Sequence, residues 1–312
     1  MCYNIIKAAM LPDTLTQRLE QQFHMVDYQR ATADERRRLA AEAQVLVVNG
    51  ESVVSEVFLA QFPQLSLIAD FGVGYDGIDV MAAQRRGIQI CNTPEVLTED
   101  VADMAMGLLL ATSRQLVGAQ RFIEQGGWLS GGYPWTKKVS GGRLGILGMG
   151  RIGQAIAQRA AAFNMTIAYN DYRQLPASPW AFYPSIVELA AASDFLMVCV
   201  NGGEKTRSLV NAPVMAALGS EGILINIARG TVVDEADLIA AVDHGIIGGA
   251  GLDVFSDEPR VPAALFNRPN VVITPHMSSA THATRRAMSD LVFDNIAAFM
   301  AGQPLLTPVA PY

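Results

Sequence analysis

The chain has 312 residues, of which 50% are apolar and 17% are charged, and its formal net charge is −7. This length exceeds what one small hydrophobic core requires and suits two domains. The negative charge and the scattered Lys and Arg residues exclude a surface built for nucleic acid. The densest basic run, 36–38, is expected in a short polar helix that faces solvent.

The termini and the cysteines bear on the compartment. The three cysteines, Cys2, Cys91 and Cys199, lack the spacing of a metal or redox motif, and the last two lie in apolar runs. The chain opens into residues 4–7 without the long apolar stretch of a signal peptide. Its most apolar helical run, 101–111, contains an aspartate and is too short to span a membrane. These features predict a cytoplasmic protein, and no residue pattern predicts a metal site.

The first third of the chain alternates short apolar runs with amphipathic helical runs. The expected strands are 4–9, 25–28, 45–48, 65–69 and 89–91, and the expected helices include 15–23 and 33–43. Strands that alternate with helices at this spacing pair in parallel, so this part predicts a sheet with helices on both faces.

The middle of the chain is expected to leave this pattern. Thr98 begins a long apolar helix that we expect to continue through 101–123, and Glu99 and Asp100 in its first turn favour the helix dipole. Pairs of glycines then follow between residues 126 and 142, where no helical or strand period is visible. This stretch predicts an extended crossing segment.

Strand–helix alternation resumes after the glycine pairs. The expected strands are 144–147, 166–169, 195–200, 223–227, 249–253 and 271–274, and a last helix is expected at 285–300. Their nearly continuous hydrophobicity fits strands that are buried on both faces of a second parallel sheet.

A glycine-rich turn with Gly148, Gly150 and Gly153 stands between the first of these strands and the helix that follows it. In such a turn the first glycine allows the tight bend, and the second lets the backbone approach a pyrophosphate. The third lets helix and strand pack closely. Amides at the helix start, including those of Arg151 and Ile152, would face the phosphates. A plain connecting turn is the alternative, and the surrounding strand and helix favour the dinucleotide.

Two residues after the next strand bear on the choice of dinucleotide. Asp171 stands where an acid would bind both hydroxyls of the adenosine ribose, which favours NAD. Arg173 could instead bind a 2′-phosphate through its planar guanidinium, which would suit NADP. A solvated turn aspartate is the alternative for Asp171, and both cofactors, NAD and NADP, stay open.

Three polar residues follow strand ends late in the chain: Arg229, Glu258 and His276. Ligands of open α/β sheets bind beyond the carboxyl ends of the strands. A permanently charged arginine there can hold a substrate carboxylate and polarise a neighbouring ketone. An imidazole paired with a carboxylate keeps its proton to a higher pH, which suits a general acid.

Each of these residues also has a structural interpretation. Arg229 could pair at the surface with Asp234 or Glu235, and the pair of Glu258 and His276 could be a satisfied polar contact in a loop. The other three histidines precede a strand, end a helix or begin one, and only His276 follows a strand at the same edge as Arg229.

The motifs around these residues resemble those of the D-isomer-specific 2-hydroxyacid dehydrogenases over nearly the whole chain. The matching segments are 71–79, 92–94, 148–153, 228–230, 257–259 and 275–276. Within the family, segments 186–192, 248–258 and 304–309 are most similar to the glyoxylate/hydroxypyruvate reductases.

The resemblance implies a role for each group. Arg229 would bind substrate, Glu258 would support the imidazole, and His276 would contact substrate as the acid/base. The backbone amides of Val73 and Gly74 would receive the substrate carboxylate, which suits a glycine-rich turn after a strand, although a connecting turn without a ligand is the alternative. Further dinucleotide contacts are implied for Thr98, Ile227, Ala228, Asp253 and Ser279.

The resemblance also implies a discontinuous plan of two doubly wound parallel-sheet domains. Residues 1–97 and 282–312 would form a flavodoxin-like substrate domain, and residues 98–281 would form a Rossmann dinucleotide-binding domain inserted into it. The family dimerises through the inserted domain, so a homodimer is expected. Trp135 would then reach the neighbouring subunit's site, or pack in its own linker.

The chain departs from the family pattern at three places. Ser278 replaces a glycine that is common two residues after the histidine, so the nicotinamide contact there can differ. Segment 200–203 replaces a turn that often contains proline. Asp171 is unusual beside the NADP-type reductases.

The sequence therefore predicts an NAD(P)H-dependent enzyme that reduces small 2-keto acids such as glyoxylate or hydroxypyruvate to D-2-hydroxy acids, with His276 as general acid. One alternative is a phosphoglycerate or gluconate-type dehydrogenase. Another is an NAD-sensing interaction protein of the corepressor kind with little turnover.

Overall fold

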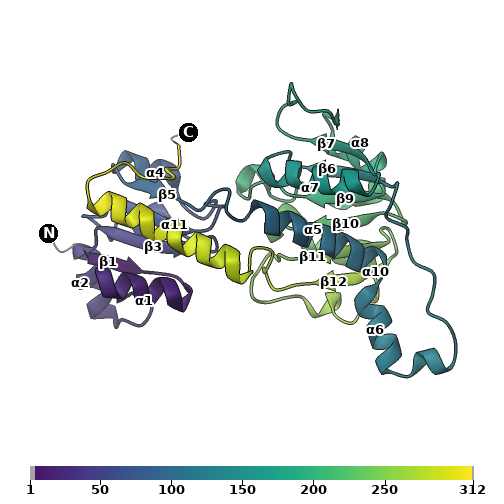
Figure 1. Cartoon of the computed structure of the whole chain (residues 1–312), viewed down its shortest axis with the longest axis horizontal. Helices are drawn as coiled ribbons and strands as arrows, with labels where there is room; N and C mark the ends of the chain where they lie inside the picture. The colour runs from purple at the N-terminus through teal and green to yellow at the C-terminus, as the bar shows by residue number, and fades with distance from the viewer. Residues whose placement is uncertain (1–3, 311–312) are drawn as a thin grey trace. The chain divides into compact units, whose positions relative to one another are not determined.

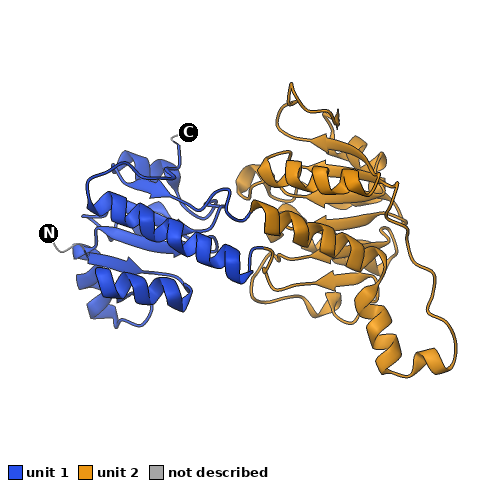
Figure 2. Ribbon diagram, viewed as in Figure 1, with its two compact units in different colours: residues 1–97, 279–312 blue, residues 98–278 orange. Residues whose placement is uncertain are grey.

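The computed structural model describes residues 4–310, and the chain divides into two units (Figure 2). Unit 1 comprises residues 1–97 and 279–312, and unit 2 comprises residues 98–278. The second boundary thus falls at residue 279, whereas the sequence suggested 282. Within the described residues no helix combines the length and the hydropathy that crossing a membrane requires.

Unit 1 is built on a parallel sheet of five strands in the order β2-β1-β3-β4-β5. Figure 1 labels three of them, β1, β3 and β5. The strands are β1 (Asn4–Lys7), β2 (His24–Asp27), β3 (Val45–Asn49), β4 (Leu67–Phe71) and β5 (Gln89–Cys91). The helices are α1 (Asp13–Gln22), α2 (Ala33–Glu42), α3 (Glu56–Leu59), α4 (Val80–Arg85) and α11 (His282–Met300). This order is that of a flavodoxin-like doubly wound sheet, as the sequence predicts.

Local signals explain the elements of unit 1. Strands β3 and β4 are buried along almost their whole length, because helices cover both faces of the sheet. Thr32 caps the amino end of α2. Its hydroxyl accepts a hydrogen bond from the amide of Glu35, and the Glu35 carboxylate accepts one from the amide of Thr32. The basic run 36–38 is exposed on this helix, as expected.

Unit 2 is built on a parallel sheet of seven strands in the order β12-β11-β10-β9-β6-β7-β8. The strands are β6 (Arg143–Leu147), β7 (Thr166–Asn170), β8 (Ala181–Phe182), β9 (Phe195–Val198), β10 (Ile223–Asn226), β11 (Gly249–Leu252) and β12 (Val271–Ile273). The helices are α5 (Thr98–Ser113), α6 (Leu116–Glu124), α7 (Arg151–Ala162), α8 (Ile186–Ala191), α9 (Ala212–Leu218) and α10 (Glu235–Asp243). Read from β8, the order is that of a Rossmann sheet, with its switch point between β6 and β9.

The single long helix expected over 101–123 is wrong, because the chain forms two helices there. Gln115 between them has a left-handed φ of 50°. The carbonyl of Ser113 accepts a hydrogen bond of 3.1 Å from the amide of Lys137 in the crossing segment. Helix α5 is extensively buried against α7 and the sheet, whereas no residue of α6 is buried. The chain therefore changes direction at Gln115, where the crossing segment binds the end of α5.

The remaining differences concern short elements. The crossing segment contains one turn of 3-10 helix, Gly127–Leu129, and is otherwise irregular up to β6, close to expectation. The strand β8 has only two residues and gives no recognisable sequence period. The expected strands that ended at 200, 227 and 253 stop one or two residues earlier. The residues after these strands instead form the loops of the candidate site.

The two cysteines within the described residues are free thiols, Cys91 and Cys199, and Cys2 lies outside them. Burial raises the pKa of the Cys91 thiol to about 12, which suits an unreactive core residue. Cys199 donates through Sγ to the carbonyl of Gly148 at 3.0 Å. This thiol is therefore part of the packing behind the glycine-rich turn.

Candidate active site

The glycine-rich turn of unit 2 connects β6 to α7, and each glycine has a distinct geometric reason. Gly148 has a φ of 98°, and a Cβ there would lie 2.8 Å from the amide nitrogen of Val200. A Cβ on Gly153 would lie 2.1 Å from the carbonyl oxygen of Gly148, so this position requires the close packing of helix and turn. A Cβ on Gly150 would meet no atom within 4 Å. The backbone is therefore open at the one glycine that a pyrophosphate would approach.

Asp171, directly after β7, is bound to this turn. Its Oδ2 accepts the amide of Met149 at 2.8 Å, and its Oδ1 accepts the amide of Tyr172 at 2.7 Å. The exposed Arg173 lies with its Cζ 5.2 Å from the centroid of the Tyr172 ring. The carboxylate is thus held at the turn, while the guanidinium lies on the outer surface of the same loop.

Arg229 follows β10 in a turn with an extended backbone and is partly buried. Its Nη1 donates to the carbonyl of Ala228 at 2.9 Å. The buried amide of Asn226 makes two bonds to the same turn. Its Oδ1 accepts the amide of Ala228, and its Nδ2 donates to the carbonyl of Arg229, each at 3.0 Å. Nearby, Asp234 caps α10 and Glu235 accepts the amide of Ser256.

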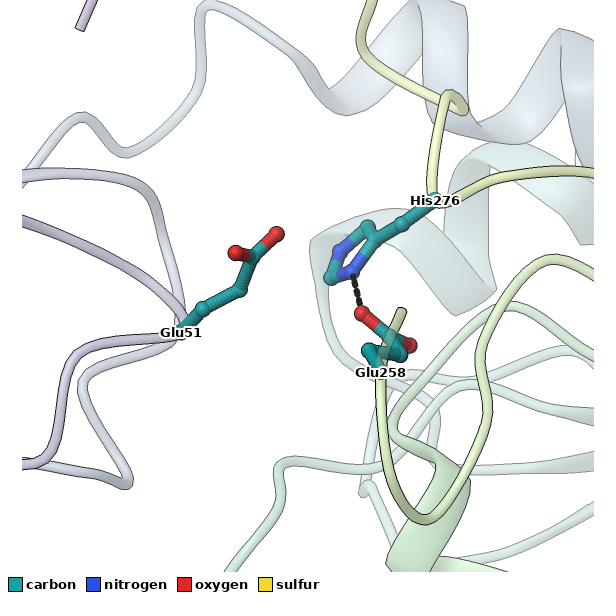
Figure 3. Close-up of side chains that lie close together, drawn as sticks. All are labelled: Glu51, Glu258 and His276. Carbon is teal, nitrogen blue, oxygen red and sulfur yellow. Dashed lines mark hydrogen bonds and ion pairs between the residues drawn. The ribbon is translucent and has the colours of Figure 1, made fainter. Parts of the chain in front are cut away.

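His276 and Glu258 face each other across the loops after β12 and β11 (Figure 3). The imidazole Nδ1 lies 2.7 Å from Oε2 of Glu258. The other carboxylate oxygen, Oε1, accepts the amide of Phe255 at 2.8 Å. An ionised carboxylate only accepts hydrogen bonds, so Nδ1 carries the proton in this pair. Nε2 is then the ring atom that can exchange a proton with a bound molecule.

The pair also sets the protonation of the imidazole. The hydrogen bond to Glu258 outweighs burial and raises the pKa of His276 above its ordinary value, although the positive charge of Arg229 works in the opposite direction. Burial alone would raise the pKa of Glu258, but the bond and charge of His276, the amide of Phe255 and the charge of Arg229 together outweigh it, so the pKa is lowered. Both shifts favour an imidazolium beside a carboxylate, which is the state that a general acid needs.

Asp253 holds the loop that carries His276. It is 1% exposed and directly follows β11. Its Oδ1 accepts the hydroxyl of Thr274 at 2.6 Å and the amide of Met277 at 2.9 Å. Its Oδ2 accepts the amide of Ser278 at 2.9 Å and the hydroxyl of the same serine. His276 itself has a left-handed φ of 48°, and these bonds to both sides of it stabilise that uncommon conformation.

Unit 1 carries its own glycine-rich turn after β4, with Val73 and Gly74 partly exposed. The carbonyl of Gly72 accepts the amide of Thr93 at 2.7 Å, and the carbonyl of Val73 accepts Nδ2 of Asn92 at 2.9 Å. The segment after β5 therefore binds the carbonyls of the turn, which fixes the peptide planes that carry the amides expected to bind a carboxylate.

A cavity of about 360 Å³ opens at the carboxyl ends of β1 and β3. These strands flank the switch point of the unit 1 sheet, where ligands of doubly wound sheets bind. The residues that line it are Ala8, Ala9, Met10, Tyr28, Gln29, Val48, Asn49, Glu51, Ser52, Val53, Val54 and Phe58. The loop after β3, which lines this cavity, packs closely on the glycine-rich turn after β4. A Cβ on Gly72 would lie 3.2 Å from the amide nitrogen of Gly50.

The remaining residues expected at the site are distributed over both units. Thr98 is the first residue of α5, and Ile227 and Ala228 are buried in the turn after β10. Ser279 is the first residue of the second segment of unit 1, and Trp135 is fully exposed in the crossing segment of unit 2.

Two buried asparagines, Asn92 and Asn226, have no role assigned from the sequence, although Asn92 lies in the matching segment 92–94. Each stands at the end of an apolar strand and binds the carbonyl of a residue expected to hold a substrate carboxylate. A polar residue that interrupts an apolar run at its carboxyl end was the available signal. At Asn226 this signal stands only three residues before the more reactive side chain of Arg229.

The site can be compared with known proteins. Residues 106–278 match the family model described as the D-isomer specific 2-hydroxyacid dehydrogenase, NAD binding domain. The chain is 46% identical to glyoxylate/hydroxypyruvate reductase A of Arabidopsis thaliana over 85% of each chain. It is 42% identical to hydroxyphenylpyruvate reductase of Plectranthus scutellarioides over 95% of each chain.

A solved structure is similar over nearly the full length. It is that of an NADPH-dependent glyoxylate/hydroxypyruvate reductase from Sinorhizobium meliloti in complex with NADP and malonate. The TM-score is 0.92 at 42% identity, and the match covers 99% of this chain and 97% of that one.

Proposed function

This chain belongs to the D-isomer-specific 2-hydroxyacid dehydrogenase family, and we propose that it reduces small 2-keto acids through Arg229, Glu258 and His276. Its relatives are NAD(P)-dependent reductases, and it is an enzyme of this class. The observation that carries the residue assignment is the 2.7 Å bond between His276 Nδ1 and Glu258 Oε2. It leaves Nε2 as the proton donor at the carboxyl edge of unit 2.

The residues act on the two polar groups of a 2-keto acid. The dinucleotide supplies a hydride for the keto carbon. His276 gives the Nε2 proton to the oxygen that becomes the hydroxyl, and Glu258 stabilises the imidazolium before this transfer. Arg229 holds the carboxylate and polarises the carbonyl, together with the amides of Val73 and Gly74. One hydride and one proton convert the ketone to a D-2-hydroxy acid.

The dinucleotide is NAD or NADP, and the residues present fit its pyrophosphate. Gly150 leaves the backbone open at the start of α7, where the amides of Arg151 and Ile152 stand. Thr98, Ile227, Ala228, Asp253 and Ser279 remain proposed contacts to the cofactor. For the adenosine ribose, the fixed carboxylate of Asp171 favours NAD, and the exposed Arg173 supports binding of a 2′-phosphate.

The cavity at the switch point of unit 1 bears on the substrate class. We propose that it receives the side chain of larger 2-keto acids. Met10, Val53 and Phe58 offer apolar contacts, and Ser52 and Gln29 offer hydrogen bonds. None of the residues that line it is Lys or Arg, and Glu51 adds a negative charge. An uncharged side chain suits this lining better than a phosphorylated one.

We also propose a homodimer. Helix α6 and the crossing segment extend away from the sheet of unit 2 (Figure 1). They carry apolar side chains at the surface: Leu116 at 54% exposure, Ile123 at 56%, Trp128 at 68%, Leu129 at 93% and Trp135 at 102%. Exposed apolar patches of this kind favour an interface, and a second copy of the chain is the proposed partner.

The free thiols suit the reducing cytoplasm, our proposed compartment.

The test is a matrix of keto acids against NADH and NADPH. Glyoxylate, hydroxypyruvate, pyruvate, 4-hydroxyphenylpyruvate and phosphohydroxypyruvate are each assayed by dinucleotide oxidation, and the chirality of the product is determined. We expect turnover of the uncharged keto acids to the D-isomer. Dinucleotide binding without turnover of any keto acid would favour an NAD-sensing interaction protein and contradict the proposal.

A further inference from the structure

The turn that carries Arg229 is closed by the side chain of one buried residue. Asn226, the last residue of β10, is 1% exposed. Its Oδ1 accepts the Ala228 amide and its Nδ2 donates to the Arg229 carbonyl. The Ala228 carbonyl then accepts Nη1 of Arg229. The asparagine side chain therefore binds the two peptide groups that flank the one against which the guanidinium rests.

We propose that Asn226 is a positioning residue, which orients the Arg229 guanidinium for the substrate carboxylate without touching substrate itself. The inference rests on the proposed function of Arg229. A planar guanidinium binds a carboxylate well only in a narrow range of orientations, so a small rotation of its backbone weakens the grip. A buried amide that satisfies one donor and one acceptor of the turn prevents that rotation.

On its other side, the turn that carries Arg229 packs against a neighbouring backbone. A Cβ on Gly230 would lie 1.9 Å from the carbonyl carbon of Phe255, so the backbone after Arg229 packs directly on the loop that leads to Glu258. The amide of Val232 also donates to the Arg229 carbonyl at 3.2 Å. The turn is thus held between the asparagine amide on one side and a neighbouring backbone on the other.

A further contact connects this turn to the loop of His276. The backbone carbonyl of Asn226 accepts the amide of Asp253 at 3.0 Å. The carboxylate of Asp253 holds the residues on both sides of His276. This bond uses the asparagine backbone and is kept when its side chain is replaced. A substitution of the Asn226 side chain should therefore disturb Arg229 and leave His276 in place.

The experiment is a double-mutant cycle on the full-length protein with bound dinucleotide. The probe is oxamate, an unreactive carboxylate with the shape of a small 2-keto acid, and its affinity is measured by titration calorimetry. Asn226→Ala should weaken oxamate binding about tenfold when Arg229 is present and cause no further loss in the Arg229→Ala background. It should also raise KM for the keto acid more than it lowers kcat.

A matched control separates positioning from stability. Asn270 donates through Nδ2 to the carbonyl of Gly248 at 2.9 Å, at the amino ends of β11 and β12 in the same sheet. Asn270→Ala should lower the unfolding temperature and leave oxamate affinity intact. If Asn226→Ala does not fold, Asn226→Asp keeps the side-chain volume and the acceptor for the Ala228 amide while losing the donor, and it should weaken oxamate binding as well.

Several results would overturn the inference. They are equal losses with and without Arg229, unchanged oxamate affinity in both Asn226 variants, or a loss in Asn270→Ala as large as that in Asn226→Ala. The proposed function fails separately, if Arg229→Ala alone leaves oxamate binding and turnover intact.

Discussion

The carboxyl edges of the two sheets are equipped differently. Beyond the carboxyl ends of the unit 2 strands lie charged or titratable side chains, namely Arg229 after β10 and the hydrogen-bonded pair of Glu258 and His276. At the edge of unit 1, the features are a turn with backbone amides at Val73 and Gly74 and a cavity of about 360 Å³. Both edges belong to doubly wound parallel sheets, so the difference lies in the loops and not in the scaffold.

This difference supports our proposal that the two units contribute different functions to the reaction. Proton transfer and charge stabilisation depend on titratable groups, which unit 2 supplies. Selection among keto acids depends on the fit of a side chain, which the cavity of unit 1 can provide. Changes in unit 2 should then affect all keto acids alike, and changes in unit 1 should affect some more than others.

The largest expected effect is in unit 2. His276→Ala removes the proton donor and should lower kcat by roughly 10²- to 10⁴-fold for every keto acid. Binding of the dinucleotide, measured by fluorescence titration, should stay within about twofold of the parent because the amides of the glycine-rich turn are unchanged. Near-normal turnover of any keto acid in this variant would break the assignment of unit 2 to the chemistry.

Glu258→Gln should change the pH profile of reduction. The carboxylate raises the pKa of His276, and reduction needs the protonated ring, so its removal moves the falling alkaline limb to lower pH. The rate of reduction should fall about tenfold on the alkaline side and change little in acid, where the ring is protonated in both proteins.

The matched control is Asp257→Asn, which removes an exposed carboxylate that pairs with Arg260. Its profile should be that of the parent. An alkaline limb that does not move in Glu258→Gln would show that this carboxylate has no part in proton transfer.

Asn92→Ala tests the turn of unit 1. Loss of the bond to the Val73 carbonyl should raise KM for all 2-keto acids about fivefold, since one buried hydrogen bond contributes about 1 kcal/mol, and kcat should change less. Steady-state kinetics with two keto acids measures this. Asn270→Ala, which removes a hydrogen bond to the Gly248 carbonyl in unit 2, serves as the stability control and should leave KM unchanged.

The smallest effect is expected in the cavity of unit 1. Val53 lines the cavity and is 77% exposed, so Val53→Tyr should narrow it. We expect the ratio of kcat/KM for 4-hydroxyphenylpyruvate to that for glyoxylate to fall about threefold, as modest steric changes do. Val57, also 77% exposed but outside the lining, provides the control Val57→Tyr. Equal responses in the two variants would remove the cavity from substrate selection.

Much of the fold was predictable because its strands are apolar runs between clear helices. The order of both sheets follows the doubly wound pattern that such alternation favours. The break between α5 and α6 was not predictable from periodicity, since it coincides with a left-handed φ at Gln115 and with a bond from Lys137 to the Ser113 carbonyl, neither of which a helical period reveals. Tertiary contacts of this kind override helix propensity.

The candidate site shows the same limit. Arg229, Glu258 and His276 could be selected because each is a reactive side chain after a strand. The pairing distance of His276 and Glu258, the left-handed φ of His276 and the bonds of Asp253 required the folded loops. Asn92 and Asn226 carry no reactive group, so only their contacts distinguish them from ordinary strand-end residues.

The contact at Gly230 has a consequence for how the protein can vary. Any side chain there would overlap the backbone of Phe255, so a substitution at residue 230 requires a simultaneous rebuilding of the loop that leads to Glu258. A single substitution at residue 230 is therefore barred, and only a change that is joined with a rebuilt loop could be accommodated. The turn that carries Arg229 and the loop that leads to Glu258 should therefore change together in evolution, whichever keto acid a related enzyme reduces.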